Sequence, residues 1–146
     1  MDKILFYYEN ESNGHFSNFY PCNMELKGKV WSSVEHYYQA QKAAGNEYEE
    51  TIRLAPNPDE AKKLGNAPEC PLRSNWNDFK IEAMKTALRA KYTQNADLRS
   101  KLVESGDALL IENSQKDYFW GIGADGTGLS MLGKLLMELR DDLNEG

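Results

Sequence analysis

The chain has few of the residues that bind metals or form disulfides. It contains two cysteines, Cys22 and Cys70, with no CxxC motif, and only His15 and His36 could join them as ligands. This set is poor for a structural zinc ion, which prefers a full shell of cysteine and histidine. We expect no metal site and two buried or unreactive thiols.

Basic charge and long apolar runs are also scarce. The 17 basic residues are outnumbered by 23 acidic ones, giving a net charge of −6, and the N-terminal MDKILFYYENES holds only a short apolar run. The charge argues against stable binding to duplex nucleic acid, although a local basic pocket is compatible with it. The apolar run is too short for a signal-peptide core or a membrane span, so we expect a cytoplasmic protein that does not bind membranes.

The chain length and patterning predict one folded unit. At 146 residues and 40% hydrophobic content, the chain is long enough for one core and short for two. It shows no repeat, linker or low-complexity segment. We therefore expect a single compact, mainly helical α+β domain spanning residues 1–146, with a small β-sheet.

Local patterns predict where the strands and helices lie. Strands are expected at 3–8, in a hairpin 24–31 around Lys27-Gly28, and at 108–113. Helices are expected from a Ser32/Glu35 capping box, from Asn57-Pro58 to Gly65, over 76–92, from Asn95 to near Gly106, and over 129–143. The last of these should turn Leu132, Leu135, Leu136 and Leu139 inward. Residues 68–75 are expected to form a loop.

The segment WSSVEHYYQAQK, residues 31–42, carries an acid and an amine beside an aromatic stripe. On a helix, Val34, Tyr37, Tyr38, Gln41 and Ala44 share the face expected to be buried. Glu35 and Lys42 border that face with Gln39 between them, about 20° apart in azimuth and about 10.5 Å apart along the axis. This gap is too wide for an i,i+4 ion pair and is compatible with a bound ribose.

Structural roles explain the same residues. Glu35 fits the second position of the Ser32 capping box, and Lys42 fits an ordinary solvent-facing lysine. His36 falls on the far side of the helix, where we expect it to be solvated or locally hydrogen-bonded. Spacing alone favours these structural roles over catalysis.

A glycine-rich segment, KDYFWGIGADGTG at 116–128, precedes the last predicted helix. Its glycines allow positive φ and close approach of a ligand, and the following helix N-terminus would favour a phosphate. The spacing matches no phosphate-binding fingerprint, and Asp125-Gly126 is a common turn pair. Trp120 is either a stacking surface for a base or a core residue beside a turn.

Together, six ordered motifs resemble the YbiA-like, or NADAR, family. They cover nearly the whole chain: FSNFYP (16–21), WSSVEHYYQAQK (31–42), EAKKLGN (60–66), RSNW (73–76), ALRAKYTQN (87–95) and DYFWGIGADGTGLSMLGKLLMELR (117–140). The resemblance implies a mainly helical α+β fold and an N-glycoside hydrolase. Family members act on ribosylamino-pyrimidine phosphates of riboflavin biosynthesis or remove ADP-ribose from modified guanine or related adducts.

The resemblance also implies roles for particular residues. Glu35 matches the family glutamate and would act as acid/base at the ribose C1. In an alternative mechanism the ribose ring opens and Lys42 captures C1 as a Schiff base, with Glu35 as the proton shuttle. Further expected site residues are Asp117 as a polar catalytic ligand, Trp76 and Trp120 as pocket walls, and Asn18, Phe19, Arg73, Gly121, Gly123 and Ser130 as substrate-binding positions.

Two positions depart from the family pattern. Ser130 stands where an asparagine is expected, and Asn75 stands where an aspartate is common. Ser130 reaches less far, and Asn75 cannot act as an acid although it can cap a helix. Substrate preference is therefore expected to differ from better-known members.

The sequence thus predicts a small hydrolase that cleaves an N-ribosidic bond without metal or cofactor. Its expected partner is a nucleotide-like small molecule or an ADP-ribosylated base. A module that binds ADP-ribose without turnover and an interaction domain with core aromatics are the competing classes. The sequence leaves the oligomeric state open.

Overall fold

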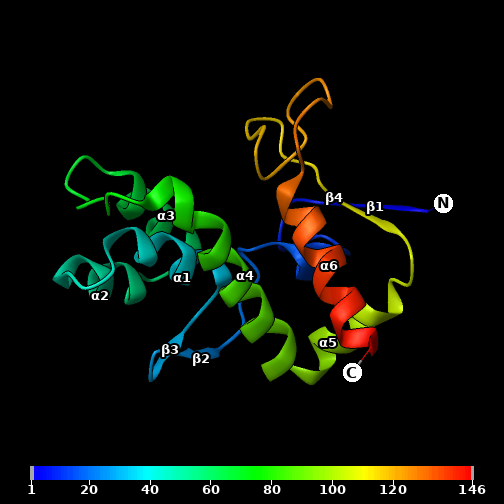
Figure 1. The fold of residues 1–146 in the computed structure, drawn as a ribbon, viewed down its shortest axis with the longest axis horizontal. Coiled ribbons are helices and arrows are strands. Elements are labelled where there is room, and N and C mark those ends of the chain that lie inside the picture. The colour runs from blue at the N-terminus through cyan, green and yellow to red at the C-terminus, as the bar shows by residue number, and fades with distance from the viewer. Residues whose placement is uncertain (1, 146) are drawn as a thin grey trace. The chain divides into compact units, whose positions relative to one another are not determined.

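The computed structural model describes residues 2–145 of the chain, and these are mainly helical (Figure 1). They contain six α-helices and two separate two-stranded sheets, which confirms the predicted α+β class. Contacts group residues 21–94 into one compact unit and residues 2–20 with 95–145 into another. The expectation of a single domain for the whole chain stays a prediction.

The unit of residues 21–94 begins with the predicted hairpin. Strands β2 (Met24–Leu26) and β3 (Lys29–Trp31) pair antiparallel around a two-residue turn. Lys27 and Gly28 have φ values of 58° and 72°, the left-handed pair that a tight hairpin turn requires. Trp31 is fully buried, and its indole N–H donates to the Leu26 carbonyl at 2.9 Å.

A short, completely buried helix occupies the middle of this unit. Helix α1 (Val34–Ala40) continues as the 3-10 turn η2 (Gln41–Ala43), and every residue from 34 to 43 is buried. It packs against helices α2 (Glu47–Arg53), α3 (Pro58–Asn66) and α4 (Trp76–Gln94). Because these helices cover α1 on several sides, its buried surface is wider than the single face that the sequence predicted.

One prediction about α1 is wrong, and a second is confirmed in one of its two alternatives. Its N-cap is Ser33, whose hydroxyl accepts the His36 N–H at 3.1 Å, so the helix does not start from a Ser32 cap. His36 is not solvated, since it is 1% exposed, but its ring makes the predicted local hydrogen bond, to Ser33 Oγ, and a second contact to the Ala55 carbonyl. A helix wheel cannot foresee this, because the far side of α1 is covered by chain from after α2.

Helices α3 and α4 begin where expected. Asn57 caps α3 by accepting the Glu60 N–H at 2.8 Å, and Pro58 occupies the first turn. The helix ends at Asn66, one residue beyond prediction, and Gly65 packs against the Gln39 side chain within the last turn. On α4, Met84, Leu88 and Tyr92 are buried as predicted and Ile81 is half-buried, while 68–75 forms a loop.

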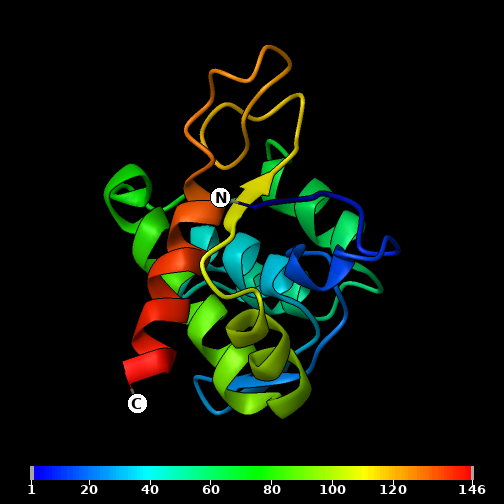
Figure 2. The ribbon, with the colours of Figure 1, turned by 90° about the vertical axis from the view of Figure 1, so that its right-hand side faces the viewer.

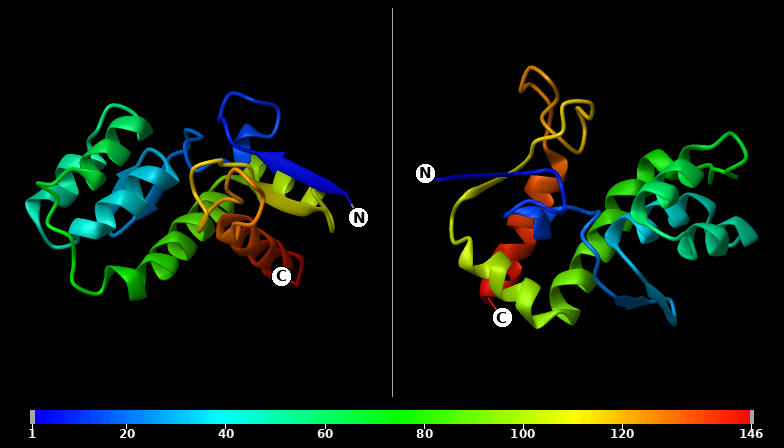
Figure 3. Two further views of the ribbon diagram at one scale, coloured as in Figure 1. Left: turned by 90° about the horizontal axis from the view of Figure 1, so that it is seen from above. Right: turned by 180° about the vertical axis from the view of Figure 1, so that it is seen from behind.

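The other unit holds the second sheet and two helices. Strand β1 (Lys3–Phe6) pairs in parallel with β4 (Leu109–Glu112), and each is slightly shorter than predicted (Figure 3). Helix α5 (Ala96–Glu104) precedes β4, and the four predicted leucines of α6 (Met131–Glu145) are buried. Gly133 allows α6 to lie on the Leu110 carbonyl of β4. Figure 2 shows the long loop 113–130 leading from β4 into α6.

Candidate active site

Lys42 lies in the 3-10 turn η2 with its amine held at the end of helix α3. Its side chain is buried, and Nζ donates to the Gly65 carbonyl at 3.3 Å and to Asn66 Oδ1 at 3.2 Å. Burial lowers the pKa of Lys42, and the field of Glu35 acts in the opposite direction. The solvent-facing alternative for Lys42 is therefore wrong, and the desolvation expected of a reactive lysine is present.

Glu35 is buried on α1 and paired with Gln39 one turn later. Gln39 Nε2 donates to Glu35 Oε2 at 2.6 Å. The Gln39 oxygen, Oε1, is buried against Gly65 and accepts no hydrogen bond from the described residues. A donor aimed at Glu35 favours its carboxylate form. The predicted trio of Glu35, Gln39 and Lys42 thus lies within one short segment.

The aromatic wall beside Lys42 comes from α1 and α4. Trp76 is 8% exposed, its ring centroid lies 5.1 Å from that of Tyr38, and Lys42 Nζ lies 6.0 Å from the indole. An apolar ring near an amine excludes water and contributes to its desolvation. Trp76 therefore adjoins the candidate catalytic amine, and its role as a wall of the substrate pocket stays a prediction.

Arg73 is tied to the same segment through its backbone. Its N–H donates to the Lys42 carbonyl at 2.7 Å, so the loop before α4 passes directly beside Lys42. Its guanidinium stacks over Phe79 at 4.0 Å, and Nε donates to Asn75 Oδ1 at 2.7 Å. Asn75 thus orients Arg73. A role for Arg73 in binding phosphate stays a prediction.

Two neighbours of Lys42 were not identified from the sequence. Asn66 accepts a bond from Lys42, and the Cys70 thiol is close enough for the field of Lys42 to oppose the increase in its pKa that burial causes. Both follow Lys42 by more than twenty residues, so no local spacing connects them. The motif EAKKLGN contains Asn66, but a motif alone does not reveal which side chain it contacts.

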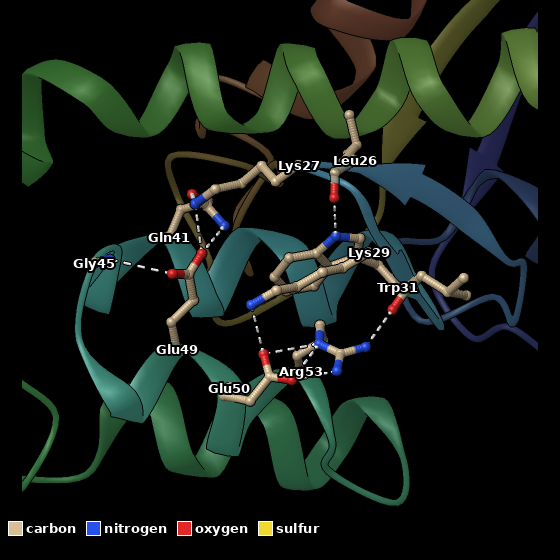
Figure 4. A network of polar contacts seen from close by, with 10 residues as sticks. Leu26, Lys27, Lys29, Trp31, Gln41, Gly45, Glu49, Glu50 and Arg53 are labelled. Atoms are coloured by element: carbon tan, nitrogen blue, oxygen red, sulfur yellow. Dashed lines mark hydrogen bonds and ion pairs between the residues drawn. The ribbon is translucent and has the colours of Figure 1, made fainter.

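A network around Glu49 fixes the chain on either side of Lys42 (Figure 4). Glu49 accepts hydrogen bonds from Gln41 Nε2 at 3.2 Å and from the Gly45 N–H at 3.1 Å. Lys27, from the hairpin turn, lies 2.5 Å from Glu49 and donates to Gln41 Oε1 at 3.1 Å. The conformation of η2 therefore depends on contacts from both α2 and the hairpin.

The remaining predicted site residues belong to the unit of residues 2–20 and 95–145. Asp117 Oδ1 accepts the N–H groups of Phe119 at 2.9 Å and Trp120 at 2.8 Å, which organises the start of the glycine-rich loop. Trp120 is half-buried, so neither of its two interpretations is excluded. The catalytic role of Asp117 stays a prediction.

Three loop positions have clear structural roles. A side chain at Gly121 would collide with Ser114 and the Asp117 carbonyl, and Gly123 has φ 73° beneath the Tyr118 ring. Ser130 has φ 45°, which an asparagine would tolerate more readily, and its Oγ accepts the Glu112 N–H at 3.2 Å. Binding of substrate by these three residues stays a prediction.

Asn18 and Phe19 follow the 3-10 turn η1 (Gly14–Phe16). Asn18 is buried, Phe19 is half-buried, and the Phe19 N–H donates to Ser17 Oγ at 3.1 Å. Their contact with a substrate also stays a prediction.

Residues 2–145 hold neither a cluster of metal ligands nor a helix able to span a membrane. Within that range no group of three or more His, Cys, Asp or Glu side chains is arranged to hold a metal ion. No helix in the same range has both the length and the apolar character to cross a bilayer. Both cysteines are half-buried free thiols.

The pairing of a desolvated amine with a hydrogen-bonded carboxylate has a definite chemical capacity. A neutral lysine amine can add to an electrophilic carbon, and a nearby carboxylate can transfer protons or stabilise positive charge. Glu35 and Lys42 provide both groups within one buried segment.

Known proteins similar to this chain cover almost all of it. A family model described as the NADAR domain matches residues 5–144. N-glycosidase YbiA of Escherichia coli (strain K12) is 43% identical over 140 residues, or 96% of this chain and 88% of that protein. Riboflavin biosynthesis protein VVA0006 of Vibrio vulnificus (strain YJ016) is 39% identical over 99% of this chain, which corresponds to 40% of that protein. An NMR structure of E. coli YbiA has a TM-score of 0.89 and 42% identity, covering 98% of this chain and 85% of that one.

Proposed function

The chain belongs to the NADAR domain family, and from this premise we propose that it hydrolyses the C1–N bond of a ribose carrying phosphate or pyrophosphate. Its general class is N-glycosidase, the name of relatives that are 42–43% identical over nearly the whole chain. The proposal that it cleaves the C1–N bond of such a ribose rests on the buried Glu35–Gln39 hydrogen bond beside the buried amine of Lys42.

Glu35 begins the reaction as a carboxylate. The 2.6 Å hydrogen bond donated by Gln39 favours the charged form. Cleavage of a ribosyl C1–N bond builds positive charge at C1, which a carboxylate stabilises. The same group can direct water toward C1 or pass a proton to the departing nitrogen.

Lys42 offers a covalent route through the opened sugar. Ring opening of a ribosylamine forms an imine between C1 and the base nitrogen. Lys42 Nζ adds to C1, and the Glu35 carboxylate takes up the protons that the added amine gives up and passes them to the base nitrogen. The bond between C1 and the base then breaks, the base leaves as a neutral amine, and C1 stays bound to Lys42 as an imine. Water then hydrolyses the lysine imine, which releases the ribose aldehyde and restores the amine.

The substrate belongs to one of two classes with the same reacting bond. A ribosylamino-pyrimidine phosphate agrees with the riboflavin-biosynthesis name of the Vibrio relative. An ADP-ribosylated base carries a pyrophosphate instead. The alternative is a module that binds ADP-ribose or a related nucleotide without turnover, and a buried, desolvated lysine with a carboxylate partner favours catalysis over that alternative.

A substrate panel followed by mass spectrometry tests the proposal. It contains a ribosylamino-pyrimidine phosphate, ADP-ribosylated guanosine and free ADP-ribose, with detection of both released base and released sugar phosphate. We expect one of the first two to be cleaved. Glu35→Gln should lower turnover by at least about 100-fold. Glu47→Gln, an exposed glutamate on α2, is the matched control and should keep wild-type turnover.

Each contrary result has a distinct meaning. Binding of ADP-ribose with no cleavage of any compound would support the module. Full activity in Glu35→Gln would remove the carboxylate from the mechanism. Borohydride reduction during turnover should attach the sugar to Lys42, and active enzyme without that adduct would exclude the covalent route while leaving hydrolysis intact.

A further inference from the structure

Among the described residues, the amine of Lys42 donates its hydrogen bonds to two uncharged oxygens. One is the Gly65 carbonyl at 3.3 Å and the other is Asn66 Oδ1 at 3.2 Å, both from the last turn of α3. A neutral amine has two N–H donors and one lone pair. These two acceptors match the two donors, so the lone pair of a neutral Lys42 is left directed away from the helix end.

The orientation of Asn66 is set by a third hydrogen bond. Its Nδ2 donates to the Lys62 carbonyl at 2.8 Å within α3. Rotating the amide by a half-turn would place its oxygen against that carbonyl and its donor group against Lys42, where both contacts are unfavourable. Asn66 therefore presents Oδ1 to the amine in one fixed arrangement, although its own side chain is largely exposed.

We propose that Asn66 is a positioning residue that holds the Lys42 amine with a neutral acceptor, so that the amine can lose its third proton and keep its lone pair oriented for attack. The inference rests on the proposed function, because it assigns Lys42 the nucleophilic role. It adds a residue that does not itself contact the sugar.

The charged and titratable groups around Lys42 explain why the side chain at position 66 needs to be uncharged. Glu35 from α1 and Cys70 from the loop after α3 favour the charged amine, whereas Lys62 from α3 opposes it. The Trp76 ring from α4 lies 6.0 Å from Nζ. An aspartate at position 66 would place a second carboxylate against the amine and keep it protonated.

A purely structural role for this contact makes a different prediction. The last turn of α3 has exposed carbonyl groups that side chains can satisfy, and Tyr48 does so by donating to the Leu64 carbonyl at 2.8 Å. If Lys42 and Asn66 only cap α3, removing either cap should affect stability and leave the reactivity of Lys42 unchanged. Tyr48→Phe is therefore the matched control, because it removes a neighbouring cap without touching Lys42.

The reactivity of Lys42 can be measured without a natural substrate. Competitive acetylation with acetic anhydride, performed over a neutral-to-alkaline pH series and read by peptide mass spectrometry, reports the neutral fraction of each lysine. Exposed Lys134 serves as the internal reference. In Asn66→Asp, we expect Lys42 acetylation near pH 8 to fall roughly tenfold and its midpoint to move to higher pH. Tyr48→Phe should keep the wild-type profile.

A second variant tests the orientation. Asn66→Ala should reduce the cyanoborohydride trapping of D-ribose 5-phosphate on Lys42 several-fold without raising the acetylation midpoint. An unchanged acetylation profile in folded Asn66→Asp, or wild-type trapping in Asn66→Ala, would overturn the proposal. If the profiles change as expected but no N-glycoside is cleaved, the proposed function fails while the positioning role of Asn66 stands.

Discussion

One carboxylate oxygen of Asp117 accepts hydrogen bonds from its own loop. Oδ1 accepts the backbone N–H groups of Phe119 and Trp120, and the Asp117 N–H donates to Ser114 Oγ at 3.3 Å. These bonds require an acceptor oxygen but no negative charge. Loop organisation and any catalytic use of the charge can therefore be separated by substitution.

Asparagine and alanine at position 117 should have different effects. Asp117→Asn retains an amide oxygen for both N–H groups, so we expect thermal stability close to wild type. Asp117→Ala leaves both donors without this acceptor and should lose about 1–2 kcal/mol of unfolding free energy. Chemical denaturation measures the stability, and kcat measures any role of the charge. An Asn variant as unstable as the Ala variant would contradict this division.

The sequence singled out the acid and the amine of the candidate site, whose catalytic roles stay predictions, but not the residues around them. Glu35 and Lys42 stood out through spacing and through family resemblance, and both are buried in one segment. The partners of Lys42 could not be predicted, because Asn66 and Cys70 reach it through the packing of α3 and its following loop on η2. The local hydrogen bond of His36 could be predicted, but its burial could not, since tertiary contacts cover its side of the helix.

At the scale of elements, Gly65 sets how closely α3 approaches α1. A side chain there would overlap the Gln39 amide and approach its Cβ at 2.9 Å. Alanine normally stabilises a helix relative to glycine by about 1 kcal/mol. Here we expect Gly65→Ala to destabilise the chain by about 1–3 kcal/mol in urea unfolding, because the overlap forces Gln39 to move.

A double variant supplies the control for Gly65. Gln39→Ala removes the amide that the new methyl would overlap and keeps Cβ, so adding Gly65→Ala to it should cost less than adding it to wild type, although not nothing. Equal costs in the two backgrounds would show that the methyl group disturbs something other than the Gln39 amide.

The hairpin turn is the second element that supports the site. Lys27 lies 2.5 Å from Glu49, a side chain 12% exposed, whereas Lys29 pairs at 3.0 Å with the more exposed Glu50. Lys27→Met should cost about 1–3 kcal/mol of unfolding free energy, because it leaves Glu49 with one charged partner fewer in a partly buried place. Lys29→Met is the matched control and should cost at most about 0.5 kcal/mol.

The pH dependence of this difference has a definite sign. Hydrogen bonds and the field of Lys27 hold the pKa of Glu49 below its ordinary value, although burial alone would raise it. A lowered folded-state pKa gives stability that is present above the unfolded value and lost as pH falls through the folded one. The extra cost of Lys27→Met should therefore diminish in acid, and a cost that stays constant would contradict the assignment to Glu49.

Element boundaries could be predicted where local chemistry decides them. Asn57-Pro58 and Lys27-Gly28 are examples, because a cap or a turn depends on adjacent residues. The end of α1 could not be predicted in this way. The chain changes to a 3-10 turn at Gln41, where Glu49 binds Gln41 and Gly45 from a separate helix. The sequence predicted one unbroken helix over residues 35–42. It could therefore not predict which side chains Glu35 and Lys42 contact.

At the scale of the whole molecule, stability depends on pH through groups whose pKa differs between the folded and unfolded chains. Lys91 is fully buried on α4, with Nζ 5.1 Å from the Tyr92 ring. Burial lowers its pKa to about 8, against a modest opposing field from Cys22. Near neutral pH, Lys91 in the folded chain must therefore either keep a buried charge or release a proton. Both lower the stability of the folded chain relative to the unfolded chain.

Replacing Lys91 with methionine should remove this contribution. A lysine with a lowered folded-state pKa binds fewer protons in the folded chain, so wild-type stability should rise relative to Lys91→Met as pH increases from about 7 to about 10. The difference in unfolding free energy should change by about 3 kcal/mol over that range. Urea unfolding at each pH measures it, with Leu88→Met on the same helix as a non-titrating control. A pH-independent difference for Lys91→Met would mean that the buried amine keeps its proton throughout, held by contacts strong enough to offset its desolvation.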